Sequence, residues 1–492
     1  MKTRYIIYTL LLSALILTGC KTPQATNLAD RTRMQLPAQF TKDSVQAQSD
    51  ASVSKSAVTP WRQFFTDPLL VSLIDTALLS NQDLRMTLQQ IAVAKSSVLF
   101  QQGALQPSVT AGGGIGVSKV GRYTSEGAGN ATTEIEPGRD MPDPLMDYQL
   151  GANASWEVDL WHKLSSGKRA AVEHYLATVE GRNAVLSSLI SQVADNYYQL
   201  LALDNKLDII HRYIELQKRA VEIAKIQKSA DADTELAVEK FQAELAKARA
   251  DEYTIRQQIT ESENTLNLLL GRYPEKIARD KTGFLSVNLQ KVMTGIPSEL
   301  LYNRPDIRQA EHELAAAKWN VDAARKEFLP SLNISASLGL DAFNPTYLTR
   351  LPKSLAFSVL GGLSGPLINR KAIQANFLSA DAQQIEALYQ YDKTLLTAYS
   401  EVCTLLSKIS NLDQYYKLKE EESNTLEHSV DVANQLYLNG RSTYLDVLMD
   451  ERDALDAKME QLDAKAQQLS GMVDVYRSLG GGGQETPSSE KK

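Results

Sequence analysis

Few residues in this 492-residue chain have the types and spacing that a chemical site needs. His312 and Glu313 resemble the start of a helical zinc motif, but Ala316 stands where the second histidine would be. The glycine run from Gly112 to Gly116 has no lysine in the register of a phosphate-binding loop. The five histidines are scattered, and no pairing of a nucleophile with a base emerges. We therefore expect no catalytic residue, no metal site and no cofactor.

One cysteine, Cys20, stands where a modifying enzyme would act. Lys2 and Arg4 precede an apolar run from Ile6 to Leu17, and the sequence then reads Thr-Gly-Cys. A positive start, a short apolar stretch and small residues before the cut are typical of a signal peptide, here residues 1–19. The Leu-x-Gly-Cys ending resembles the lipobox of bacterial lipoproteins, in which the cysteine is lipidated and becomes the first residue. An ordinary cleavage site beside a chance cysteine is the alternative.

Composition and charge exclude other classes of protein. The formal net charge is −7, and no basic patch suggests a nucleic-acid partner. Two cysteines are too few for a disulfide framework. Beyond the apolar leader, no segment has the long apolar run that a transmembrane helix needs. Residues 20–59 are rich in Gln, Ser, Thr and Ala, and we expect a lipidated, extended tether there.

The remainder of the chain contains the same pattern twice. Asp83 to Gly116 aligns without gaps with Asp306 to Gly339. Val193 to Gly271 aligns in the same way with Val402 to Gly480. Two gapless blocks in the same order indicate a tandem duplication.

Each repeat has the same plan of helix, strand, loop, strand and long helical hairpin. Proline is absent from Leu145 to Tyr273 and from Leu367 to Thr486, although the chain contains 16 prolines. Such runs, rich in Ala, Leu, Gln, Glu and Lys, favour helix. We expect the first repeat over residues 60–282, with strands near 107–119 and 147–159 and a helical hairpin over 161–271. We expect the second repeat over residues 283–480, with a helix over 304–329, strands near 331–341 and 354–365 and a helical hairpin over 370–479. Residues 481–492 are expected to form a flexible tail.

Apolar residues in both hairpins recur at the spacing of a coiled-coil seam. The predicted seam positions are Leu186, Leu189, Val193, Tyr197 and Leu200 in the first repeat and Leu455, Met459, Leu462, Ala466, Leu469, Val473 and Tyr476 in the second.

Four segments alternate between apolar residues and small polar residues, which predicts strands with one apolar and one polar face. Their length of about ten residues suits a tilted strand that crosses a membrane. A soluble, half-buried sheet is the alternative. Four strands cannot close, because the smallest membrane barrels need about eight. We therefore expect several copies of the chain to pool their strands; three copies would give twelve strands and a water-filled lumen.

Five segments then resemble a known family: Trp61–Leu70, Leu300–Ala317, Phe328–Leu332, Gly440–Leu448 and Tyr476–Gly483. They read WRQFFTDPLL, LLYNRPDIRQAEHELAAA, FLPSL, GRSTYLDVL and YRSLGGGG, and they are similar to signatures of TolC-type outer-membrane efflux channels, in the lipoprotein branch. The resemblance covers essentially the whole mature chain. It implies a mainly α fold with a membrane β-barrel: a homotrimer in which four strands per chain form a 12-stranded barrel on a coiled-coil tunnel.

The resemblance also implies a function, and this function is not enzymatic. The chain would be the outer-membrane channel of a tripartite efflux system, a passive gated conduit that exports drugs or other small toxic compounds. Its partners would be a periplasmic adaptor, a proton-driven inner-membrane pump of the resistance–nodulation–division type and outer-membrane lipid, with no nucleic acid. A conduit for type I protein secretion or metal efflux remains open. A periplasmic adaptor or a structural coiled-coil lipoprotein would lack the duplicated pairs of strands.

In that family, tight turns between the long helices form the periplasmic end of the tunnel. Gly440 suits the left-handed residue that ends a helix, and Ser442 or Thr443 can cap the next helix. Asp231 stands where glycine is expected in the first turn, so a different shape is expected there. The resemblance implies that the adaptor contacts Ala230, Asp231, Ala232, Asn439, Gly440, Arg441 and Ser442.

The family's closed gate lies just beyond the second turn, where the matching residues are Leu445, Arg452 and Asp450. Many members carry an acid four residues after the leucine, but here Met449 precedes Asp450. One residue is about 100° on a helix, so whether Asp450 faces the lumen stays open. An ordinary solvated helix surface is the alternative.

Overall fold

The structure is a computed structural model that describes residues 22–28, 37, 59–230, 234–288, 303–365 and 370–483. The predicted signal peptide, Cys20, Asp231 and Ala232 lie outside these residues. The helices are α2 (Trp61–Phe64), α3 (Pro68–Ser80), α4 (Gln82–Gly103), α5 (Ser125–Asn130), α6 (Lys163–Ser229), α7 (Glu235–Leu269), η2 (Phe284–Ser286), α9 (Pro305–Lys326), α10 (Pro345–Leu348), α11 (Lys371–Leu438) and α12 (Tyr444–Ser478). The strands are β1 (Ser108–Ser118), β2 (Glu134–Glu136), β3 (Arg139–Asp140), β4 (Leu145–Val158), β5 (Ser331–Ala342) and β6 (Leu355–Ser364).

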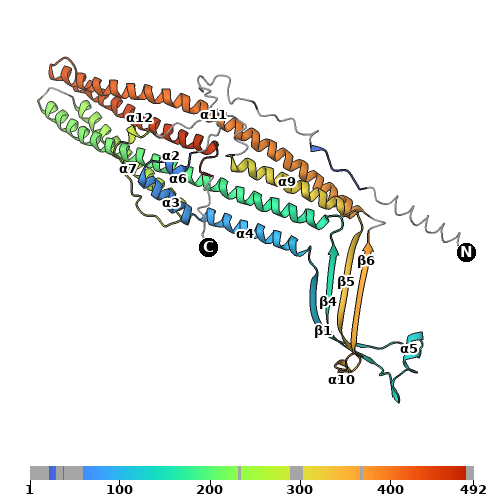
Figure 1. The fold of residues 1–492 in the computed structure, drawn as a ribbon. Coiled ribbons are helices and arrows are strands. Elements are labelled where there is room, and N and C mark those ends of the chain that lie inside the picture. Colours follow the sequence, from blue (N-terminus) through green and yellow to red (C-terminus); the bar gives the residue numbers. More distant parts are fainter. Residues whose placement is uncertain are drawn as a thin grey trace. The chain divides into compact units, whose positions relative to one another are not determined.

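The chain forms two compact units, of which the first contains the sheet. This unit combines residues 92–175 and 312–389 with the described residues 22–28. Its four long strands lie in the order β1-β4-β5-β6, and each neighbouring pair is antiparallel (Figure 1). They occupy the four segments in which the sequence predicts strands. The loop between β1 and β4 carries α5 and the short β2–β3 pair.

The register of the sheet separates its two faces. Ala154 of β4 pairs with Val109 of β1 and Ala336 of β5, and Ala336 pairs in turn with Val359 of β6. Along every strand, therefore, residues of this apolar row alternate with residues of the opposite face. The opposite face is built mainly from Ser, Asn, Gln and Gly, with the acids Asp147, Glu157 and Asp341. Such a sheet can meet lipid on one side and water on the other.

The outer strands of this sheet are half-paired. Within the described residues, β1 pairs with β4 alone and β6 pairs with β5 alone. Each outer strand thus presents one row of backbone N–H and C=O groups to a further strand. In a membrane these groups must be paired, because lipid offers no hydrogen bonds.

The N-terminal tether contacts the sheet-containing unit at α11. The backbone N–H and the hydroxyl of Thr26 donate to the two carboxylate oxygens of Asp381, at 2.9 and 2.6 Å. The tether residues 22–27 form no helix or strand.

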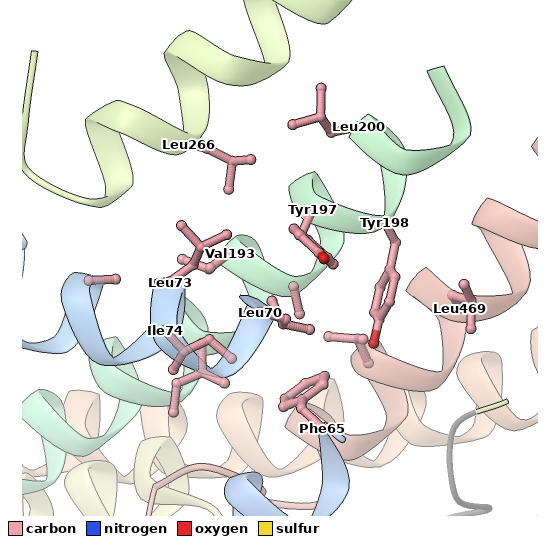
Figure 2. Packing of buried hydrophobic residues seen from close by; sticks show 14 of the residues in the cluster. Phe65, Leu70, Leu73, Ile74, Val193, Tyr197, Tyr198, Leu200, Leu266 and Leu469 are labelled. Atoms are coloured by element: carbon pink, nitrogen blue, oxygen red, sulfur yellow. The ribbon is translucent and has the colours of Figure 1, made fainter. Parts of the chain in front are cut away.

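The second unit holds the largest hydrophobic core and the turns of both hairpins. Its core joins α2 and α3 to the middle of α6, the end of α7 and the C-terminal half of α12. Figure 2 shows Tyr197 and Tyr198 of α6 among Leu70, Ile74 and Leu469. The hydroxyl of the buried Tyr197 donates to Asp67 at 2.6 Å, so the phenol is satisfied inside the core.

The long hairpins follow the predicted seams. All five seam positions of the first repeat lie in this core, and so do Leu462, Ala466, Leu469, Val473 and Tyr476 of the second. Leu455 and Met459 pack against a smaller cluster around Ile210 and Tyr213. The coiled-coil prediction is therefore confirmed for both repeats. The helices α6 and α11 contain 67 and 68 residues, which corresponds to about 100 Å each.

The start of the C-terminal tail differs from the expectation. Residues 481–483, which the sequence assigns to a flexible tail, form a buried turn. The Gly481 carbonyl accepts a hydrogen bond from Ser187, and Gly480 and Gly482 have positive φ. Glycine permits this close packing because it has no Cβ. The rest of the tail lies outside the described residues.

Among the described residues, no helix is long and apolar enough to cross a membrane.

Candidate functional site

The turn of the second hairpin is built by local rules. Gly440 has φ +66°, and the Gly440 and Arg441 N–H groups donate to the carbonyls of Tyr437 and Leu436, both at 2.9 Å. This left-handed glycine satisfies the last carbonyls of α11 and stops the helix. Gly440 therefore has the predicted conformation.

The next helix, α12, begins with a complete capping box. The Thr443 hydroxyl oxygen accepts from the Asp446 N–H, and the Asp446 carboxylate accepts from the Thr443 N–H at 2.9 Å. Ser442 also donates to Asp446, at 3.0 Å. The hydrogen bond from the Thr443 hydroxyl is the main cause that lowers the pKa of Asp446. Of the two residues predicted to cap this helix, Ser442 and Thr443, the structure has Thr443 as the N-cap.

The residues expected to meet an adaptor lie at the ends of the hairpins. Asn439, Gly440 and Arg441 are exposed, and Ser442 is half-buried. In the first hairpin, Ala230 is exposed at the end of α6, while Asp231 and Ala232 lie outside the described residues.

Beneath the turns, the two hairpins share a small hydrophobic core, which we call the tip core. It consists of Ala220, Val221, Ala224, Val238, Phe241 and Leu448, with Ala237, Leu245, Tyr444 and Leu445 packed against it. It joins α6 and α7 to α12, so the first and second hairpins hold one another near their ends.

An aromatic chain extends the tip core to α11. The ring of Tyr444 lies 5.3 Å from that of Phe241 and 5.1 Å from that of Tyr437, between ring centroids. The Tyr437 hydroxyl accepts a hydrogen bond from the Gln227 side chain of α6. Gln227 and Tyr437 are thus a second link between the hairpins, which the sequence analysis did not identify. The two tyrosines that flank the turn in YLNGRSTY were the available signal, but their partners are remote in sequence.

The three candidate gate residues occupy different environments on α12. Leu445 is half-buried against the tip core. Arg452 binds Asp453, with its Nη2 atom 3.0 Å from Oδ1, and this contact raises the pKa of Arg452. Leu445 and Arg452 are seven residues apart and share one side of the helix, whereas Asp450 lies about 140° around from Leu445. The structure thus groups Leu445 with Arg452 and separates Asp450 from them.

His312 and Glu313, which begin the zinc-like motif, contact side chains of α6. His312 Nδ1 lies 2.8 Å from the Glu173 carboxylate, and His174 Nδ1 lies 3.0 Å from that of Glu313. In the described part of the chain, no group of three or more His, Cys, Asp or Glu residues is arranged to hold a metal ion.

Comparison with known proteins matches this architecture to a family. The profile of the family described as "Outer membrane efflux protein" matches residues 73–272 and 296–481. The chain belongs to the outer membrane efflux protein family. It is therefore an outer-membrane efflux channel, and the predicted family and fold class are confirmed.

Individual relatives cover most of this channel. It is 29% identical to the pyoverdine export outer membrane protein OpmQ of Pseudomonas aeruginosa, over 87% of this chain and 88% of OpmQ. It is 26% identical to the cation efflux system protein CusC of Escherichia coli K12, over 95% of this chain and 98% of CusC. A solved structure of CusC matches with a TM-score of 0.79 at 25% identity, covering 94% of this chain and 99% of that one.

Proposed function

We propose that three copies of this chain form one gated conduit, which exports drugs or other small toxic compounds as the outer-membrane part of a tripartite efflux pump. The two-faced sheet with its half-paired outer strands is the observation that supports the trimer most. Twelve strands give a pore of useful width, whereas eight leave an interior filled by side chains. The conduit itself is passive, without an enzymatic step.

We further propose that the hairpin turns contact a periplasmic adaptor, which links the conduit to a proton-driven pump in the inner membrane. The exposed residues Asn439, Gly440 and Arg441 support this role, because a turn held by its own hydrogen bonds offers a preformed surface. Docking of the adaptor on an open form of the turns would shift the conduit toward that form.

The gate in this proposal is the start of α12. Three copies would bring three Leu445 and three Arg452 side chains near one axis, with Asp453 neutralising each arginine. Exposed pairs of this kind contribute only about 0–1 kcal/mol each. Asp450, which lies about 140° around α12 from Leu445, would not face the same axis and is left out of this gate.

The gate is tested by the leak conductance of the purified channel in planar bilayers. Arg452→Ala and Leu445→Ala should each raise it several-fold, because one removes an ionic contact and the other an apolar constriction. Asp251→Asn, at an exposed position of α7, is the control and should leave it unchanged. If both gate variants conduct like the wild type, the gate does not lie here.

Cys20 is proposed to carry lipid that anchors the tether in the outer membrane. Two or three acyl chains bind durably, whereas one binds marginally. Mass spectrometry of the mature N-terminal peptide should show a lipidated Cys20 as its first residue. Cys20→Ala should impair processing. An unmodified cysteine, or cleavage elsewhere, contradicts the proposal.

A further inference from the structure

The C-terminal end of α12 is held by one buried arginine. The helix has 35 residues and runs from the proposed gate to Ser478. Its last carbonyls have no partner within the helix. Arg304, directly before α9, donates from Nη1 to the Ser478 carbonyl at 2.9 Å. The Arg304 side chain is only 8% exposed.

The same guanidinium binds two further helices. Its Nε and Nη2 atoms donate to the Asp306 carboxylate at 3.0 and 2.7 Å, and Nη1 also donates to Glu401 of α11 at 2.8 Å. Arg477 of α12 donates to the other oxygen of Glu401 at 2.7 Å. Arg304 therefore fastens α11 and α12 together at the root of the second hairpin. Bidentate, charge-assisted contacts of this kind fix geometry as well as charge.

The duplication supplies an internal comparison. Asn81 and Leu269 of the first repeat align with Arg304 and Ser478 of the second. Asn81 donates from its side chain to the Leu269 carbonyl at 2.9 Å, which is the same contact at the same place. Its side-chain oxygen accepts from the Leu84 N–H at 2.9 Å and so caps α4. The Leu269 carbonyl at the end of α7 is thus held by a neutral amide, and the Ser478 carbonyl at the end of α12 by a buried cation with three partners.

The backbone approach is identical in both repeats. Gly480 has φ +95°, and a Cβ at this position would lie 2.3 Å from the Asn303 carbonyl oxygen. Gly271 has φ +65°, and a Cβ there would lie 2.2 Å from the Ser80 carbonyl oxygen. Both helix ends therefore dock by the same close contact. The difference between the repeats lies in the side chain that holds the end.

We propose that Arg304 is a positioning residue that clamps the root of the α11–α12 hairpin and thereby holds the gate end of α12 closed. In the first repeat the guanidinium that joins the two helices, Arg279, binds Asp204 of α6 and Glu263 of α7, whereas the Leu269 carbonyl at the helix end is bound by Asn81. The clamp is placed on the hairpin that carries Leu445 and Arg452, so the inference rests on the proposed gate. Because α12 is one continuous helix from Tyr444 to Ser478, it links the clamped end directly to the proposed gate.

The test compares matched variants in the two repeats. A spin label at Arg441→Cys, in a Cys403→Ser background, reports the distances between hairpin turns of different copies by double electron–electron resonance. Arg304→Gln removes the cation, and Gly480→Ala disturbs the helix end without removing a charged side chain. Asn81→Ala and Gly271→Ala make the corresponding changes in the first repeat.

We expect both second-repeat variants to broaden the distribution of label distances and to raise leak conductance roughly tenfold. The first-repeat variants should change neither. If Arg304→Gln does not assemble, Gly480→Ala and Gly271→Ala alone decide the matter. Unchanged distances in the second-repeat variants that assemble, or equal broadening in the first-repeat variants, overturn the proposal. Broadened distances at unchanged conductance support the clamp and refute the gate.

Discussion

Channels that carry Tyr437→Phe should stay open far longer in planar bilayers than wild-type channels do. The substitution keeps the ring against Tyr444 and removes the hydroxyl that accepts from Gln227. One such hydrogen bond contributes about 1 kcal/mol net. If three copies release together, the closed state loses about 3 kcal/mol, which corresponds to roughly a hundredfold change in the ratio of open to closed channels.

Two comparisons make the Tyr437 experiment specific. Tyr253→Phe removes a hydroxyl from an exposed tyrosine of α7 and should leave the open fraction unchanged. Tyr437→Ala removes the ring as well and should exceed the effect of Tyr437→Phe. An open fraction that stays at the wild-type level in both Tyr437 variants shows that the link does not hold the closed state.

A second large effect is expected from Asp195, a half-buried acid in the second unit. Burial, followed by the neighbouring charge of Asp474, raises the pKa of Asp195 to about 7. Lys408 and Arg477 oppose this shift, and Ser470 donates one hydrogen bond. The Oδ1 atom of Asp195 is buried without a hydrogen-bond partner among the described residues. An ionised Asp195 is therefore costly to the folded protein.

The pH dependence follows from the direction of this shift. Between about pH 4 and pH 7 the folded state holds a proton on Asp195 that the unfolded state has released. The free energy of unfolding therefore falls as pH rises, by up to about 1.4 kcal/mol per pH unit from this group. Above pH 7 the full cost of about 4 kcal/mol remains.

Asp195→Asn should remove this cost. Its melting temperature should exceed that of the wild type clearly at pH 8 and much less at pH 5, where the wild-type carboxyl is already neutral. The exposed replacement Asp251→Asn should give no such difference. A gain that is equal at both pH values contradicts the assignment of the proton to Asp195.

The sequence predicts those parts of the fold that local rules determine. Strict alternation in Ser331–Leu340 predicts both the strand and its two faces, because a strand has a period of two. Gly440 and Thr443 predict the turn, because a left-handed residue and a cap are needed there. The coiled-coil seams follow from apolar spacing alone.

Contacts between distant segments could not be predicted in this way. Gln227 and Tyr437 are far apart in the chain, and no spacing rule joins them. Arg304 falls within a recognised motif, yet its partners Glu401 and Ser478 come from two other helices. Residues 481–483 form a packed turn, but the sequence predicts a flexible tail there because glycine runs also occur in flexible segments. In each case the contact depends on tertiary packing, which the local sequence does not specify.

In the proposed trimer, each chain supplies a third of one closed barrel. Native mass spectrometry of the detergent-extracted protein tests it most directly, since the mass counts the copies without assuming how they pair. We expect a complex of three chains that retains its β-sheet signal by circular dichroism. A stable monomer with an intact β-sheet signal would contradict it, because the half-paired strands β1 and β6 would then need no neighbour.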